Sequence, residues 1–443
     1  MTPRVQFGIG RVTRFYVPLL LQAFSQSLTY PLVAGIVTHG PFGVNALTAF
    51  SQGQMIMFMI GALGGGLVMT GMVFGTNRRG YLNFRRLNGI LMVALLLLQC
   101  IPALPPLNRL VFEGFFALPP DLADLARWTL LLGVVMNGSF FLRNVPMVVL
   151  FNNLQSGKAN TATFIRILLT MACAAVFPRI GLVGAYWGLL ALTLGCIVEY
   201  IITWLYARPY VHTLLSEEGA DAAVGDSVAT QFRFTLPLSL GGFLLMVSPL
   251  IVAAFVGRTE NAADMLAIHY VTLGVANPVA YAALRMQAVA IEFPPEYKGD
   301  HRLLWFALAA GAVLGVIPFI FSLPHLGGWY FGSYQNVPPR ILGTARLAVG
   351  IYSFICLIQV VRGRVEGLAA IRKRPDAVMA GQIGYTVALL TTLAALRPFG
   401  IAGWAMAVTA IFVAPAFAAT SVYAALAFRP LKIFGIHNRR ASS

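Results

Sequence analysis

The sequence has little charge for its length. Of its 443 residues, 10% are Asp, Glu, Lys or Arg, whereas 58% are hydrophobic. A water-soluble chain of this size needs far more charge to cover its surface, so the composition excludes a soluble globular protein. Apolar runs of about 20 residues recur along the chain, and each is long enough to cross the hydrocarbon core of a bilayer as a helix. These features predict a polytopic membrane protein.

The sequence also lacks the short motifs that mark common catalytic and metal sites. Its four cysteines lie in apolar runs without CxxC spacing, which argues against a metal site and a disulfide framework. It contains no HExxH, GxSxG or GxxxxGK[ST] motif, which argues against a zinc hydrolase, a serine hydrolase and an ATP-binding loop. We therefore predict that the protein is not an enzyme and that it binds no cofactor and no metal ion.

The apolar runs are continuous and do not alternate with polar residues, which favours helices over the strands of a barrel. We predict an all-α fold of twelve transmembrane helices. The predicted spans cover residues 14–37, 44–75, 87–107, 123–151, 160–178, 182–206, 233–256, 264–293, 303–321, 341–369, 377–396 and 401–427.

Basic residues outnumber acidic ones by 31 to 15, which gives a formal net charge of +16. Most of the Lys and Arg residues flank one side of the predicted spans, as in Arg78–Arg79 after the second span and Arg372–Arg374 after the tenth. This pattern predicts that both termini face the cytoplasm. We expect the basic face to contact anionic membrane lipids and not nucleic acid. The compact loops and short termini suggest the bacterial inner membrane.

Several short stretches occur twice, 219 residues apart. "LPPDLADLARWTLLLG" at Leu118 matches "VPPRILGTARLAVGIY" at Val337, and "RFYVPL" at Arg14 matches "RFTLPL" at Arg233. Several matches at one offset predict an internal duplication. The paired prolines should begin spans 4 and 10, because proline is tolerated in the first turn of a helix.

The duplication predicts the domain organisation. Each repeat holds six spans, so both copies enter and leave the membrane on the same side and should be related by a pseudo-two-fold axis along the membrane normal. We predict an N-terminal lobe at residues 1–207 with spans 1–6, a cytoplasmic linker at 208–232 and a C-terminal lobe at 233–443 with spans 7–12. We expect a monomer.

The chain resembles the multidrug/oligosaccharidyl-lipid/polysaccharide exporter superfamily. The resemblance depends on the "RF-x-x-PL" box that opens each repeat, on "GLVMTGMVFGTNRRG" at the end of span 2, and on "QVVRGRVEGLAAIRKR" closing span 10. It covers nearly the whole chain, and the chain is most similar to the progressive ankylosis protein branch. The resemblance implies a two-lobed, MATE-like exporter that works by alternating access, and the branch implies organic or phosphorylated anions as cargo.

Charged residues inside the predicted spans are the first candidates for a transport site, because charge in a bilayer is costly. Arg143 and Arg362 are the strongest, since they occupy equivalent positions in the two repeats. Arginine suits a carboxylate or phosphate group because its planar fork can donate two hydrogen bonds at once. We predict a substrate site that holds an anion in a cavity between the repeats. Its candidate residues are Arg143, Arg362, Arg285, Arg166, Arg364, Gln22, Gln26, Asn277 and Gln287.

Three acids in the spans are candidates for coupling transport to protons or sodium ions: Glu199, Glu366 and Glu292. Glu199 could instead neutralise a nearby arginine, and Arg362 could pair with Glu366 one turn further along its helix. His269 is interpreted as an interfacial side chain with an ordinary hydrogen bond. Typical multidrug members of the superfamily carry an essential acid in the first helix, and this first span has none.

Together these observations predict a secondary active exporter of an organic or phosphorylated anion. The alternatives are a flippase for a lipid-linked saccharide, a multidrug/cation antiporter, and a membrane enzyme that acts on a lipid phosphate. A flippase would also need a cationic cavity, whereas an antiporter for cations would need acids there.

Overall fold

The computed structural model describes residues 7–42, 44–116, 118–216, 227–297, 299–334 and 337–427. Within these ranges the chain is helical and forms no strand. Eleven helices of the described part are long and apolar enough to cross a membrane, and the 30-residue helix α1 (Ile9–Thr38) covers the remaining predicted span. The prediction of an all-α, polytopic, twelve-helix fold is confirmed.

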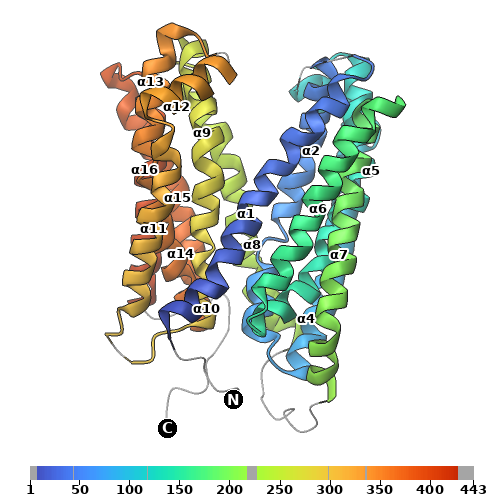
Figure 1. The fold of residues 1–443 in the computed structure, drawn as a ribbon, viewed down its shortest axis with the longest axis vertical. Coiled ribbons are helices and arrows are strands. Elements are labelled where there is room, and N and C mark those ends of the chain that lie inside the picture. The colour runs from blue at the N-terminus through green and yellow to red at the C-terminus, as the bar shows by residue number, and fades with distance from the viewer. Residues whose placement is uncertain are drawn as a thin grey trace. The chain divides into compact units, whose positions relative to one another are not determined.

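The helices fall into the two halves of the sequence (Figure 1). Those of the first half after α1 are α2 (Val44–Ala62), α3 (Leu67–Phe74), α4 (Arg78–Cys100), α5 (Pro120–Asn152), α6 (Ser156–Val176) and α7 (Ala185–Ser216). Those of the second half are α8 (Val228–Val256), α9 (Ala262–Leu284), α10 (Met286–Glu292), α11 (Arg302–Ile320), α12 (Pro324–Gly327), α13 (Pro339–Tyr352), α14 (Ile355–Ile371), α15 (Pro375–Leu396) and α16 (Gly403–Ala427).

Element boundaries repeat at the offset found in the sequence. Helices α5 and α13 start at Pro120 and Pro339, as predicted, and two π-helical turns, η2 (Arg109–Phe115) and η5 (Gly328–Tyr334), also lie 219 residues apart. Side chains follow the same rule. Arg127 Nε donates to the carbonyl of Ala103 at 2.9 Å, and Arg346 Nε donates to that of Ser322 at 3.2 Å. The duplication therefore extends from sequence to hydrogen bonding.

Three predicted spans are each divided into two helices. Span 2 breaks between α2 and α3, span 8 at Arg285 between α9 and α10, and span 10 between α13 and α14. The first break contains three consecutive glycines, Gly64–Gly66, which lack the side chains that favour a continuous helix. A Cβ on Gly66 would also lie 2.8 Å from the carbonyl oxygen of Thr235, so a larger residue would not fit there.

The described chain forms two compact units. One, here the C-unit, contains residues 1–24 and 240–443, and the other, here the N-unit, contains residues 25–239. Helices α1 and α8 each contribute residues to both units. Helix α7 continues to Ser216 and α8 begins at Val228, so helical turns extend into the predicted 208–232 linker from both sides, and residues 217–226 lie outside the described part.

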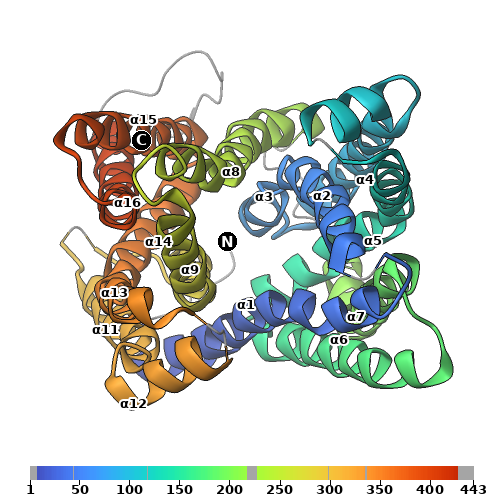
Figure 2. The same cartoon turned by 90° about the horizontal axis from the view of Figure 1, so that it is seen from above.

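Each unit has an apolar core. In the N-unit, α5 packs against α2 and α7 through buried residues such as Met57, Leu130 and Leu189, and Figure 1 shows α5, α6 and α7 running side by side. In the C-unit, α15 and α16 pack along their length, and α14 lies beside α9, as Figure 2 shows. These cores hold the polar side chains described next in fixed positions.

Candidate functional site

Three predicted residues of the N-unit meet in one buried ionic network. Arg143 of α5 donates from Nη1 to Glu199 Oε2 at 2.7 Å, and Arg166 of α6 donates to the same oxygen at 3.1 Å. The hydroxyl of Thr163 donates to the other carboxylate oxygen. Phe140 contributes its ring, whose centroid lies 4.8 Å from the guanidinium carbon of Arg143. We call Arg143, Arg166 and Glu199 the N-unit triad.

The N-unit triad joins three helices inside the unit, because Glu199 lies on α7. Arg143, Arg166 and Glu199 are 7%, 2% and 1% exposed. One carboxylate thus serves two guanidinium groups, which leaves the triad with a formal charge of +1. In a low-dielectric interior such pairs are strong but depend on every partner being present.

The repeat-related arginine of the C-unit has different neighbours. Arg362 donates from Nε to Glu366 Oε1 and from Nη2 to Gln382 Oε1, both at 2.8 Å. Gln382 and Gln287 donate in turn to the two oxygens of Glu366, at 3.1 and 3.2 Å. The ring of Tyr385 lies 5.2 Å from the Arg362 guanidinium carbon. The acid here comes from the same helix, one turn after the arginine.

Two glycines make this network possible. A Cβ on Gly363 would lie 2.7 Å from the carbonyl oxygen of Leu284, and a Cβ on Gly367 would lie 2.5 Å from that of Gln287. Their small size lets α14 approach the break between α9 and α10, much as small residues allow close helix contacts in membranes. The close approach brings the Gln287 side chain within reach of Glu366.

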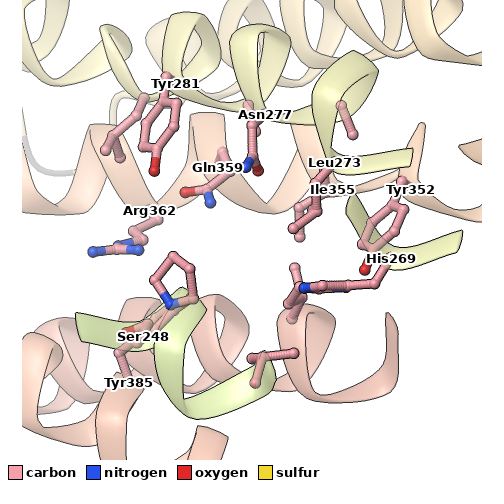
Figure 3. A pocket seen from close by; sticks show the side chains of 16 residues that line it. Ser248, His269, Leu273, Asn277, Tyr281, Tyr352, Ile355, Gln359, Arg362 and Tyr385 are labelled. Carbon is pink, nitrogen blue, oxygen red and sulfur yellow. The ribbon is translucent and has the colours of Figure 1, made fainter. Parts of the chain in front are cut away.

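Arg362 also lines a pocket inside the C-unit (Figure 3). We call it the Arg362 pocket, and its cavity volume is about 90 Å³. Helices α8, α9, α13, α14, α15 and α16 contribute to it. Its polar lining residues are Ser248, His269, Asn277, Tyr281, Tyr352, Gln359, Arg362 and Tyr385.

Several polar atoms of this lining are buried without a hydrogen-bond partner among the described residues. They are both ring nitrogens of His269, the hydroxyl oxygen of Tyr352 and Oε1 of Gln359. The interpretation of His269 as an ordinary interfacial residue was wrong, because its side chain is 1% exposed and its ring makes no hydrogen bond in the described structure. Buried polar groups are usually satisfied, so their clustering around a cavity indicates a place for a polar ligand or for water.

The remaining predicted residues are spread over the C-unit. Asn277 lines the Arg362 pocket, Arg285 is the half-buried residue between α9 and α10, and Glu292 ends α10. Arg364 lies on α14, and its Nε is buried without a partner within the described residues. Gln22 is buried in α1, and the side chain of Gln26 lies outside the part that the structure describes.

Sequence reasoning missed His269, Tyr352 and Gln359 as site residues. One signal in the sequence could have found two of them. The residues 219 positions earlier than His269 and Gln359 are Phe50 and Phe140, so an aromatic position of the first repeat has become polar in the second. Such a replacement within a duplicated apolar span is a reason to suspect a site.

Comparisons with known proteins relate the fold to membrane transporters. No family profile matches the chain, and no curated relative matches it. Among solved structures it is similar to the eukaryotic MATE transporter AtDTX14, with 14% identity over 95% of each chain and a TM-score of 0.69. It is also similar to an outward-facing multidrug resistance MATE family transporter of the MOP superfamily, with 17% identity over 94% of each chain and a TM-score of 0.67. The chain has the MATE fold.

A third neighbour with the MATE fold is a MOP superfamily transporter from Pyrococcus furiosus, with 15% identity over 94% of each chain and a TM-score of 0.67. The report of that structure describes a binding pocket of reverse polarity and suggests a different function for it. At these identities the similarity shows the fold, and the progressive ankylosis branch stays a prediction.

Proposed function

We propose that the protein is a secondary active transporter that exports a small organic anion. The MATE fold supports a transporter, since the neighbours that share it are described as transporters. The reversed pocket polarity reported for the Pyrococcus furiosus neighbour supports a cargo other than a cationic drug. The observation that carries the anion proposal is Arg362, a membrane-buried arginine that lines a pocket.

The bonding of Arg362 supports this role. Its Nε and Nη2 atoms are held by Glu366 and Gln382, while Nη1 donates no hydrogen bond to a described residue. The guanidinium group is therefore oriented by protein partners and keeps one nitrogen for a ligand. A carboxylate or phosphate group is the natural acceptor, and hydroxyl groups of tyrosines in the lining could donate to the same group.

The N-unit triad supports the same preference for anions. Its two arginines and one carboxylate add positive charge inside the membrane-spanning part, which favours a negatively charged cargo. Within the proposal, Glu199 and Glu366 stay candidates for coupling to protons or sodium ions. Protonation of either acid would weaken its bond to an arginine and so change the charge of the site.

Counterflow in proteoliposomes tests the proposal. Labelled citrate, nucleotides, pyrophosphate and small monocarboxylates are compared with a cationic dye and a lipid-linked saccharide. We expect exchange of a small anion, at least tenfold slower for Arg362→Gln, since hydrogen bonds to charged groups are worth about 1.5–3 kcal/mol. The control is Arg397→Gln, which removes the same charge from an exposed position of the same repeat.

Two outcomes would overturn the proposal. Movement of the dye without movement of any anion would favour the antiporter for cations. Movement of the lipid-linked saccharide alone would favour the flippase.

A further inference from the structure

The Arg362 pocket has a second polar end. His269 of α9 and Tyr352, the last residue of α13, lie together in Figure 3 at the end opposite Arg362. Between the two ends lie apolar residues such as Ile355 and Leu273, beside the amides of Asn277 and Gln359. We call His269 and Tyr352 the distal pair.

We propose that the distal pair is an uncharged subsite that binds a hydroxyl group of the cargo. This inference rests on the proposed function and narrows its substrate to small hydroxylated organic anions. The acid group of the cargo would lie at Arg362 and the hydroxyl group at the distal pair.

Burial and hydrogen bonding support the subsite. His269 and Tyr352 are each 1% exposed, and neither His269 nitrogen nor the Tyr352 hydroxyl has a hydrogen-bond partner in the described ranges. Leaving such groups unsatisfied costs about 1–3 kcal/mol each. A ligand that supplies the missing hydrogen bonds would recover this free energy, which is a strong basis for selectivity.

The atom types indicate a hydroxyl group. A neutral imidazole presents one donor and one acceptor, and a tyrosine hydroxyl can do either. An alcohol also donates one hydrogen bond and accepts others, so it can satisfy His269 and Tyr352 together. A second carboxylate at this end would place another negative charge in a pocket whose Arg362 is already paired with Glu366.

The size of the cavity limits the cargo. A volume of about 90 Å³ corresponds to several water-sized sites, since one buried water needs at least about 10–15 Å³ by this measure. The pocket therefore fits a short hydroxycarboxylate and is too small for a nucleotide or a lipid-linked saccharide.

The duplicated fold shows that these polar groups are not needed for packing. The position equivalent to His269 in the first repeat is Phe50, which is 3% exposed, and that equivalent to Tyr352 is Gly133. His269→Phe should therefore fold, because the same position accepts phenylalanine in the other copy. Tyr352→Phe keeps the ring and removes only the hydroxyl group.

Paired competition measurements on the full chain in proteoliposomes test the subsite. The probes are 4-hydroxybutyrate and butyrate, which differ in one hydroxyl group, with 3-hydroxypropionate and propionate as a shorter pair. We expect the wild type to prefer the hydroxylated anion at least fivefold. Both His269→Phe and Tyr352→Phe should bring this ratio close to one while uptake of the unsubstituted anion persists.

Three results separate failure of the subsite from failure of the proposed function. Equal transport of both anions by the wild type would overturn the subsite and leave the transporter proposal intact. An unchanged preference in both variants, even if either variant is more stable, would also overturn it and would assign the distal pair to water. If no anion is transported, thermal shifts of the detergent-solubilised protein with each probe decide. Stabilisation by 4-hydroxybutyrate that both variants lose would support the subsite while the proposed function fails, and no difference between the probes would overturn the subsite.

Discussion

Arg143 and Arg362 occupy the same position in the two repeats but have different surroundings. The acid that binds Arg143 is Glu199, and the equivalent residue of the second repeat is Ala418. The acid that binds Arg362 is Glu366, and its equivalent in the first repeat is Met147. Each repeat has therefore kept the arginine and placed its counter-ion differently.

This difference separates a structural role from a binding role. Glu199 reaches Arg143 and Arg166 from another helix, so the N-unit triad holds three helices together. Glu366 shares a helix with Arg362 and leaves that arginine at the wall of a pocket. The equivalent of Arg166 in the second repeat is Tyr385, so a second arginine has been replaced there by an aromatic ring. Duplication thus supplied two copies of one buried cation, and their neighbours direct them to different tasks.

The largest expected effect is the loss of the acid in the N-unit triad. Glu199→Gln leaves two buried guanidinium groups without a carboxylate, which should destabilise the protein by about 3–5 kcal/mol. Thermal unfolding of the detergent-solubilised protein measures this. Asp124→Asn, which removes an exposed acid next to Arg127, should cost less than about 0.5 kcal/mol. If Glu199→Gln were as stable as this control, the structural role of the triad would be refuted.

The next effect distinguishes the two arginines by function. Arg143→Gln should lower the unfolding temperature more than Arg362→Gln does, whereas Arg362→Gln should reduce anion counterflow more, by tenfold or greater. The reason is that Arg143 joins helices through Glu199, while Arg362 binds an acid of its own helix. Thermal unfolding and counterflow are measured on the same preparations. Equal losses for both variants in both assays would show that the repeats have not diverged in role.

A smaller effect concerns the glycines beside Arg362. Gly363→Ala places a Cβ 2.7 Å from the carbonyl oxygen of Leu284 and should destabilise the protein by about 1–3 kcal/mol through overpacking. The first repeat has Asn144 at this position, so the constraint belongs to the second repeat alone. The control is Gly343→Ala in α13, where a Cβ meets nothing within 4 Å. A thermal shift for Gly363→Ala no larger than that for the control would contradict the close approach of α14.

The smallest effect depends on pH and concerns the loop between α10 and α11. Arg302 donates to both oxygens of Asp300, at 2.9 and 2.8 Å, and these hydrogen bonds hold the pKa of Asp300 well below its ordinary value. A lowered pKa stabilises the folded state above the ordinary carboxyl pKa of about 4, and this stabilisation is lost as the pH falls further. Asp300→Asn should therefore cost up to about 1 kcal/mol at pH 7 and progressively less below pH 4.

Chemical unfolding between pH 3 and pH 8 measures this dependence. Glu260→Gln, which changes an exposed acid of the same unit, should show no comparable pH dependence. A difference between Asp300→Asn and the wild type that stays constant across this range would contradict the role of Arg302. Tyr81 stands at the equivalent position of the first repeat, so the loop clasp is another point at which the two copies differ.

Much of the fold could be predicted from the sequence because its signals are local. Apolar runs long enough to cross a bilayer must become helices, since backbone groups cannot stay unpaired in lipid. The 219-residue offset predicted equivalent helix starts, such as Pro120 and Pro339, and it identified Arg143 and Arg362 as a pair. Polar residues within these runs were visible for the same reason.

Tertiary structure decided which of these residues meet. Arg143 and Glu199 are 56 positions apart, and the distal pair brings together α9 and α13, so no local pattern could indicate either contact. The breaks at Arg285 and after Tyr352 depend on packing between helices as well as on helix propensity. The sequence determined where charge enters the membrane, whereas the packing of distant helices determined which charges are paired and which polar groups still lack a partner.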